Sequence, residues 1–471
     1  MKRAALLLVL VLCACGGDDD GGGGGGPGAA DAAPGIDGAP GEDGGRDPDA
    51  GPQEVRALYY YWGDVESDGI ARVGRVDHDA GSRELLELEG LAGGAQITAV
   101  AVAPGGELIA VAGRDTAGGQ LQVNLYAGGG GAPTALFTGS RGDEAVTAIA
   151  FSPDGARIAL RGDLESAGEN ALYVAPVLAG EEPLRVSHEP VEGRDVEGFF
   201  WADARTLVFT GDTVADQVTG LYAVDVAAGS PAPVALVPDG ALAAGQEVRR
   251  AHGADAEGRV YFTSTHEEPA TRRLYRVGLA GDGLEQVPGS AIDDGGEAEI
   301  GAFGLSPAGD RVAFAARGPE AESDAVYVLD LASGGAEAIL VSAVTPSSGS
   351  GEGGLREAEP IRFAPDGASI AVAADYQLAG GEDGFAVWLF PTAAPAGGVR
   401  LLAPAVFGGS LAEVAFLPTG DRLIARGDLV TDNAAELFEL TDLATADQDP
   451  AAARTEEVPD GGDVLGIALA P

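Results

Sequence analysis

The sequence predicts an all-β protein folded as a closed β-propeller of four-stranded blades, and three observations support this. A Pro-Gly turn preceded by a short apolar run recurs about every 52 residues. Each copy is followed by further apolar runs of strand length, separated by acidic loops or short polar turns. The two ends of the chain carry complementary parts of one repeat unit.

The first 14 residues are predicted to be a signal peptide. The positive pair Lys2 and Arg3 precedes apolar residues 4–12, a stretch too short to span a bilayer. The sequence Leu-Cys-Ala-Cys at 12–15 resembles the lipobox of bacterial lipoproteins. That resemblance implies cleavage before Cys15 and lipid attachment to Cys15; an ordinary secretory signal that happens to contain two cysteines is the alternative.

Residues 15–53 are predicted to be the lipidated cysteine and a disordered tether rich in Gly, Asp and Pro, because this composition buries too little apolar area to order the chain. Gly16 follows Cys15 where an Asp would resemble an inner-membrane retention signal, so we expect an outer membrane lipoprotein of the cell envelope. Both cysteines lie in the first 15 residues, which leaves the rest of the sequence without a disulfide.

The formal net charge of −46 limits the possible partners. The phosphate backbone of nucleic acids would be repelled by such a surface, so we expect no nucleic-acid partner. Basic envelope or extracellular proteins and cations are favoured instead. We expect a monomer that contacts the membrane through the lipid at Cys15.

The repeat occupies residues 54–471 and is seen most clearly at 151–176, FSPDGARIALRGDLESAGENALYVAP. Its first strand, strand A, is rich in Ala and apolar on both faces, as at 146–152 and 411–417, which is expected of an innermost strand packed between neighbouring blades. In the following turn, Pro presets φ and Gly tolerates positive φ. Copies of this turn lie at 103–106, 152–155, 306–309, 364–367 and 417–420, with degenerate copies at 201–203 and 254–256.

Three further strands follow each turn. Strand B comes directly after the turn, and an acidic loop leads to strand C. Strand C carries a signature of an apolar residue before an aromatic one, at Leu172-Tyr173, Leu221-Tyr222, Leu274-Tyr275, Val326-Tyr327 and Leu437-Phe438. Edge strand D follows a short polar turn, for example at 183–187 and 337–342.

The chain ends predict how the ring closes. Residues 462–471 have the pattern of a strand A, whereas 56–78 begin a repeat that lacks one. The N- and C-terminal strands should therefore share the closing blade, which removes free edges. Seven internal blades and the shared blade favour eight; seven is the alternative.

The Pro-Asp-Gly repeats resemble those of TolB-like β-propellers, which are themselves similar to WD40-like repeat propellers. The resemblance covers 54–471 and implies the fold. TolB has six blades and a preceding α/β domain, whereas here eight blades follow a tether, so the resemblance does not imply TolB's role in the cell.

No motif in the sequence indicates an enzyme. Prolyl-peptidase families also carry a propeller, but their G-x-S-x-G motif in a hydrolase domain is missing. The four histidines are scattered over different blades and are interpreted as ordinary surface or strand residues. Arg-Gly-Asp at 141–143, 161–163 and 426–428, which binds integrins in animal matrix proteins, is interpreted as chance. We expect a non-enzymatic protein-interaction or ligand-binding scaffold; the alternative is a hydrolase or lyase with acidic residues in the central channel.

Acidic residues collect in the B–C and D–A loops, which share one face of a propeller. In the loop that follows the first strand, Asp64, Glu66 and Asp68 precede Gly69, like the start of a calcium-binding D-x-D-x-D-G loop. Arg72 occupies position nine, where another acid is usual. Calcium bound by Asp64, Glu66 and Asp68 is therefore one hypothesis for this loop, and a solvated acidic turn is the other; no other cofactor is expected.

Overall fold

The computed structural model describes residues 58–469, apart from residues 67, 78–81, 92–95, 115–118, 140–144, 166–167, 178–180, 190–192, 194, 216–217, 239–241, 243–245, 268–270, 289, 291–298, 318–323, 333–337, 343–360, 375–384, 394–397, 405–410, 432–433 and 457–461. The predictions for the signal peptide, Cys15 and the tether fall outside the described residues.

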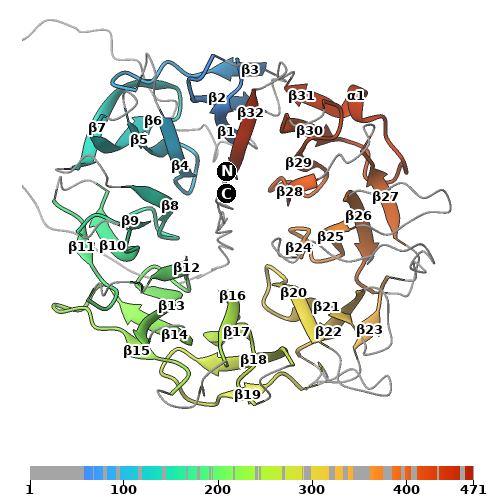
Figure 1. Cartoon of the computed structure of the whole chain (residues 1–471). Coiled ribbons are helices and arrows are strands. Elements are labelled where there is room, and N and C mark those ends of the chain that lie inside the picture. The colour runs from blue at the N-terminus through green and yellow to red at the C-terminus, as the bar shows by residue number, and fades with distance from the viewer. Residues whose placement is uncertain are drawn as a thin grey trace, which may run out of the picture.

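The described strands form eight antiparallel four-stranded sheets arranged in a ring, which confirms the all-β propeller and the count of eight blades (Figure 1). Blade 1 contains β4 (Gln96–Val102), β5 (Leu108–Arg114), β6 (Leu121–Ala127) and β7 (Gly130–Thr138). Blade 2 contains β8 (Val146–Phe151), β9 (Arg157–Gly162), β10 (Ala171–Pro176) and β11 (Leu184–Arg185). Blade 3 contains β12 (Val196–Trp201), β13 (Thr206–Ala215), β14 (Val218–Asp225) and β15 (Val234–Ala235). Blade 4 contains β16 (Val248–Ala254), β17 (Arg259–Ser264), β18 (Arg273–Gly278) and β19 (Glu285–Gln286).

The second half of the ring repeats this order. Blade 5 contains β20 (Glu299–Leu305), β21 (Arg311–Arg317), β22 (Ala325–Asp330) and β23 (Ile339–Leu340). Blade 6 contains β24 (Arg362–Phe363), β25 (Ser369–Ala374), β26 (Ala386–Pro391) and β27 (Val399–Leu402). Blade 7 contains β28 (Leu411–Phe416), β29 (Leu423–Gly427), β30 (Glu436–Leu440), α1 (Pro450–Ala453) and β31 (Arg454–Glu456). No helix in the described part of the chain is long and apolar enough to cross a membrane.

The closing blade joins the two ends of the chain, as the sequence predicts. It contains β1 (Leu58–Asp64), β2 (Arg72–Asp77), β3 (Ser82–Leu85) and, as its innermost strand, β32 (Asp463–Leu469). Strand β32 pairs antiparallel with β1, with Tyr61 opposite Ile467. In Figure 1 the red β32 accordingly lies beside the blue β1.

Apolar side chains fill the space between each pair of neighbouring blades. One such core joins blades 1 and 2, and another joins blade 7 to the closing blade; each of the other six junctions has its own. Because burial between blades continues around the whole ring, the hydrophobic effect holds the circle closed.

In blades 3, 4 and 5 the signature aromatic residue of strand C stacks on an aromatic residue opposite it in strand B. Tyr222 lies opposite Phe209, and their ring centroids are 5.2 Å apart. Phe262–Tyr275 and Phe314–Tyr327 repeat this stacked pair in blades 4 and 5. The signature therefore records a cross-strand pair, the unit that stabilises a sheet.

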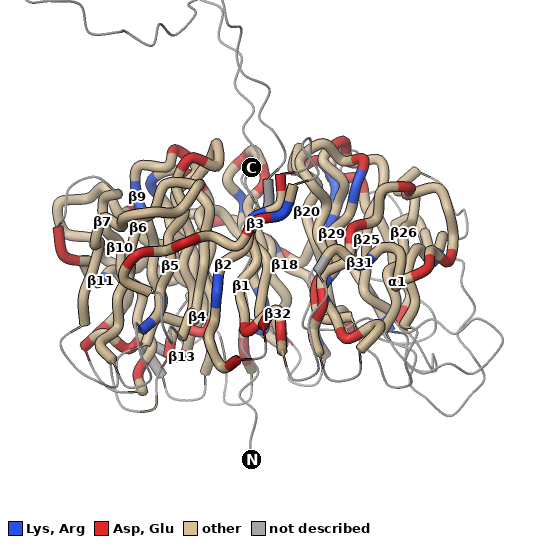
Figure 2. Tube along the Cα trace, turned by 90° about the horizontal axis from the view of Figure 1, so that it is seen from above, with Lys and Arg blue, Asp and Glu red and all other residues tan. Residues whose placement is uncertain are grey.

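The A–B turns have the conformation that their residues predict. In blade 2 the Gly155 N–H donates to the Ser152 carbonyl at 2.8 Å, and Gly155 has a φ of 67°. Antiparallel order places the A–B and C–D connections at one face of the ring, here called the turn face, and the B–C and D–A connections at the other, here called the loop face. Figure 2 shows the ring edge-on, with carboxylates (red) at both of these faces.

Candidate functional site at the inner strands

The acidic loop after β1 brings together the carboxylates that the sequence singles out. Asp64, the last residue of β1, accepts hydrogen bonds from the backbone N–H of Asp68 at 3.0 Å and of Gly69 at 2.9 Å. Asp64 thus closes its own loop, as an Asx-type turn does.

The other two carboxylates of this loop face a guanidinium. Asp68 accepts two hydrogen bonds from Arg72, at 3.0 and 2.7 Å, and Glu66 forms an ion pair with the same guanidinium at 2.9 Å. The hydrogen bond from Arg72 is the main cause that lowers the pKa of Asp68 to about 2. Calcium in this loop remains a prediction, and binding would require the ion to displace Arg72.

Other acidic residues of the loop face tie neighbouring blades together. Asp463, at the start of β32, accepts the Ala435 N–H of blade 7 at 2.9 Å. Asp195, directly before β12, accepts the Asn170 N–H of blade 2, and Glu299 in β20 accepts from Arg272 Nε of blade 4 at 2.6 Å. These three carboxylates of the loop face therefore have a structural role.

The prediction that strand A is apolar on both faces is wrong in several blades. Glu197 in β12, Arg249 and Arg250 in β16, Arg362 in β24 and Glu413 in β28 are charged residues of innermost strands. They form two clusters at the inner strands, which we take as the candidate functional site. Their signal was present in the sequence, since each interrupts an otherwise apolar or small-residue run.

The first cluster is centred on Glu197, where blades 3 and 4 meet at the loop face. Thr219 Oγ1 donates to Glu197 Oε1 at 2.8 Å. Burial is the largest effect raising the pKa of Glu197, and the negative charges of Asp212 and Glu247 raise it further. Arg249, which forms an ion pair with Glu247 at 2.6 Å, opposes this rise. Three carboxylates thus crowd one edge of the inner ring.

Arg161 links this cluster to blade 2. Its side chain is buried; Nε donates to Thr147 Oγ1 at 2.9 Å, and Nη1 donates to the backbone carbonyl of Glu197. Arg426 makes the same connection in blade 7, because its Nη1 donates to the carbonyl of Val464 in the closing blade at 3.2 Å. The Arg-Gly-Asp copies at 161–163 and 426–428 thus occupy equivalent places at the end of strand B and belong to the repeat. The copy at 141–143 lies outside the described residues.

The second cluster is centred on Glu413. This carboxylate is buried and accepts from Arg426 Nε at 3.2 Å. Burial raises the pKa of Glu413, while the positive charges of Arg426 and Arg362 oppose the rise.

Arg362 also acts on His252 of blade 4, so the second cluster extends across the inner ring. Burial and the charges of Arg250 and Arg362 lower the pKa of His252 to about 3. Its Nε2 is buried without a hydrogen-bond partner in the described part of the chain, and its ring lies 5.2 Å from Phe303. His252 is therefore a neutral inner-strand histidine, whereas the sequence suggested no special environment for it.

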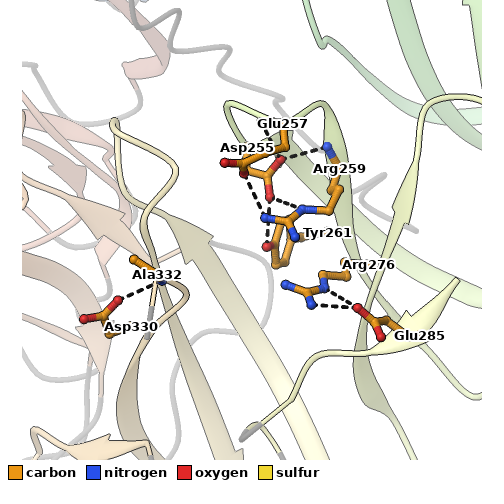
Figure 3. Close-up of polar contacts among 8 residues, drawn as sticks. All are labelled: Asp255, Glu257, Arg259, Tyr261, Arg276, Glu285, Asp330 and Ala332. Carbon is orange, nitrogen blue, oxygen red and sulfur yellow. Dashed lines mark hydrogen bonds and ion pairs between the residues drawn. The ribbon is translucent and has the colours of Figure 1, made fainter. Parts of the chain in front are cut away.

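On the turn face, carboxylates are satisfied by arginines and turn N–H groups. Asp255, in the degenerate turn of blade 4, accepts from the Arg259 N–H at 2.8 Å, from Arg259 Nε at 2.7 Å and from Tyr261 at 3.1 Å (Figure 3). Arg276 and Glu285 form a further ion pair at 2.6 Å, and Asp330 caps the following turn at Ala332. The carboxylates of Asp255, Glu285 and Asp330 are thus satisfied by donors of their own blades.

Among the described residues, no group of three or more His, Cys, Asp and Glu side chains has an arrangement that would hold a metal ion.

Comparison with known proteins shows the fold. No family model matches the chain, and no curated protein matches it significantly. Among solved structures, a prolyl endopeptidase is 12% identical with a TM-score of 0.50. The match covers 75% of this chain and 50% of the endopeptidase chain. An oligogalacturonate lyase from Vibrio parahaemolyticus is 13% identical with a TM-score of 0.47. The match covers 77% of this chain and 94% of the lyase chain. The β-propeller domain of the Trilobed protease from Pyrococcus furiosus is 13% identical with a TM-score of 0.43. The match covers 75% of this chain and 100% of that domain's chain.

This chain spans between 42% and 50% of the length of the first three peptidases that it matches. At such low identity the likeness extends to the β-propeller fold and no further.

Proposed function

We propose that the protein is a lipid-anchored scaffold of the cell envelope that binds a basic partner at the inner edge of its loop face. The gathering of Glu197, Asp212 and Glu247 carries this proposal: burial is the main cause of the raised pKa of Glu197, and the charges of Asp212 and Glu247 raise it further against the opposing charge of Arg249. A lysine or arginine of a partner would supply the missing positive charge. The net charge of −46 would also attract such a partner over a longer range.

Binding of a fluorescent hexalysine peptide to the full chain tests this site. We expect Glu197→Gln to weaken binding several-fold at low salt. Glu285→Gln is the matched control, because it removes one carboxylate charge from the turn face, where Glu285 is 52% exposed beside Arg276. Equal weakening by both variants would mean that only the net charge matters and would contradict a site at Glu197.

The anchor rests on Cys15 and has its own test. Two or more acyl chains, at about 0.8 kcal/mol for each buried CH₂, would hold the protein stably on the outer membrane. Cys15→Ala, or globomycin treatment of cells, should release the protein from membranes or stall its processing. Unchanged fractionation and mass would contradict lipid attachment at Cys15.

The second hypothesis is a hydrolase or lyase that uses inner-strand carboxylates. Burial raises the pKa of Glu413, which favours it, since a carboxyl with a raised pKa is a potential general acid. However, the Glu413 side chain is only 4% exposed, and a substrate would need to displace its surroundings to reach it. Turnover of a substrate that is abolished by Glu413→Gln and kept by Glu197→Gln would favour this hypothesis over the scaffold.

A further inference from the structure

The C–D connection of blade 7 differs from that of the other blades. It runs through residues 441–453, whereas the corresponding connections span 128–129 in blade 1 and 279–284 in blade 4. It contains α1, the sole helix in the described part of the chain. Asp447 in this connection has a φ of 52°, and no other described residue apart from glycine has a positive φ. Such backbone strain is kept only where the surroundings enforce it.

The connection is fastened to the neighbouring blade. The Asp447 N–H donates to the Arg400 carbonyl at 2.8 Å, and the Gln448 N–H donates to the Leu401 carbonyl at 2.9 Å. Arg400 Nε in turn donates to the Asp447 carboxylate at 2.6 Å. These hydrogen bonds hold the C–D connection of blade 7 against blade 6.

The connection lines one side of an open cavity of about 540 Å³ between blade 7 and the closing blade. Its volume lies within the range of pockets that hold small ligands. Three arginines and three carboxylates from both blades line the cavity: Arg83, Arg422, Arg454, Asp77, Glu439 and Asp449. Thr441, Gln448 and Thr455 add hydroxyl and amide groups.

The arginines of the cavity differ in their pairing. Arg422 forms an ion pair with Glu439 at 2.7 Å, and Arg454 forms one with the buried Glu436 at 2.7 Å. Arg83, on β3 of the closing blade, is exposed and has no ion pair or side-chain hydrogen bond in the described part of the chain. In a chain with so large an excess of acid, an arginine that pairs with no described carboxylate and lies at the mouth of a polar cavity is a ready anion contact.

We propose that this cavity binds a small hydroxycarboxylate, with its carboxylate on Arg83 and its hydroxyl groups among the polar side chains of blade 7. A single negative charge completes the pairing of Arg83. Glu439 is paired with Arg422, so Asp77 and Asp449 are the carboxylates of the cavity that would oppose the second charge of a dianion. The bound molecule would contact both blade 7 and the closing blade, and would so stabilise the junction at which the ring closes.

Titration of the full chain with D-gluconate, followed by isothermal calorimetry and thermal unfolding, tests the proposal. Sorbitol has the same carbon skeleton without the carboxylate, and 6-phosphogluconate carries additional negative charge. We expect gluconate to bind and to raise the melting temperature, sorbitol to give no measurable binding, and 6-phosphogluconate to bind more weakly than gluconate.

Arg83→Gln should weaken gluconate binding about tenfold, which is the effect of losing one charge-assisted contact. Arg205→Gln is the matched control, because Arg205 is 64% exposed on blade 3, far along the ring from the cavity. No binding of gluconate, equal binding of sorbitol, tighter binding of 6-phosphogluconate, or equal weakening by both variants would overturn the proposal.

Discussion

At the scale of the residue, one position of the repeat shows how an acid replaces a hydroxyl. In blade 2 the Arg157 N–H donates to Ser152 Oγ at 2.9 Å, and in blade 5 the Arg311 N–H donates to Ser306 Oγ at 3.0 Å. Blade 4 has Asp255 at this position, and its carboxylate accepts the Arg259 N–H in the same way. The degenerate turn therefore keeps the hydrogen bond of the intact turn and adds an ion pair.

Asp255→Ala should destabilise the protein by about 3 kcal/mol, because it removes the acceptor of the buried Tyr261 hydroxyl and of the Arg259 N–H and Nε, and leaves the Arg259 guanidinium with only the exposed Glu257. Asp255→Ser should recover part of this loss, since serine accepts the equivalent backbone N–H in blades 2 and 5. Chemical denaturation measures both values. Glu257→Gln is the control, because Glu257 is 66% exposed in the same turn. A loss from Asp255→Ala no larger than that of the control would contradict this role.

His252 should make the protein sensitive to mild acid. Its pKa is lowered to about 3 in the folded state from the ordinary histidine value of 6.5, so the unfolded chain takes up a proton over this interval while the folded chain does not. Stability should therefore fall as the pH decreases from about 6.5 toward 3. His252→Gln should lose less stability than the unaltered protein between pH 7 and pH 5, as measured by denaturant unfolding. Identical pH slopes would show that the histidine is solvated.

At the scale of the element, the start of strand A in blades 2 and 3 approaches strand B so closely that strand B needs a glycine there. A Cβ on Gly162 would lie 2.1 Å from the Ala145 carbonyl oxygen, and one on Gly211 would lie 2.3 Å from that of Asp195. The register of strand A shifts at the same level, between Val146 and Ala148 in blade 2. The glycine and the bulge together position the charged inner-strand residues.

Gly162→Ala should destabilise the protein by about 1–3 kcal/mol, the usual effect of overpacking, because backbone must move to make room. Gly301→Ala is the matched control, since a Cβ there would have no atom within 4 Å. Thermal unfolding of the two variants checks the prediction. Equal melting temperatures would mean that strands A and B separate at no cost.

At the scale of the whole molecule, the closing blade holds the ring together. Strand β32 contributes Val464, Ile467 and Leu469 to the core shared with blade 7. It also supplies the innermost strand next to β1. The closing blade is therefore incomplete without the last residues of the chain.

Deletion of residues 462–471 should destabilise the entire ring, because it exposes two apolar cores and creates a free strand edge. A large decrease in melting temperature or loss of cooperative unfolding is expected in calorimetry. Leu465→Ala serves as the control, since Leu465 is 44% exposed in the same strand and its truncation should have little effect. A truncated protein that melts like the parent would contradict closure by β32.

The sequence alone determined the eight blades, the A–B turns and the shared closing blade. These features depend on interactions between residues close together in the sequence, such as the Gly155 turn and the apolar-aromatic pair at Leu172-Tyr173. The same residue pattern recurs in each copy of the repeat, so it can be recognised in the sequence. Only the tertiary structure decided which charges meet. Glu197 and Glu247 belong to blades 3 and 4. Arg362 belongs to blade 6, and its charge lowers the pKa of His252 in blade 4 and opposes the rise in the pKa of Glu413 in blade 7. These side chains are close because the curvature of the ring brings the innermost strands together at its axis. The spacing of residues along the chain does not indicate which side chains meet there.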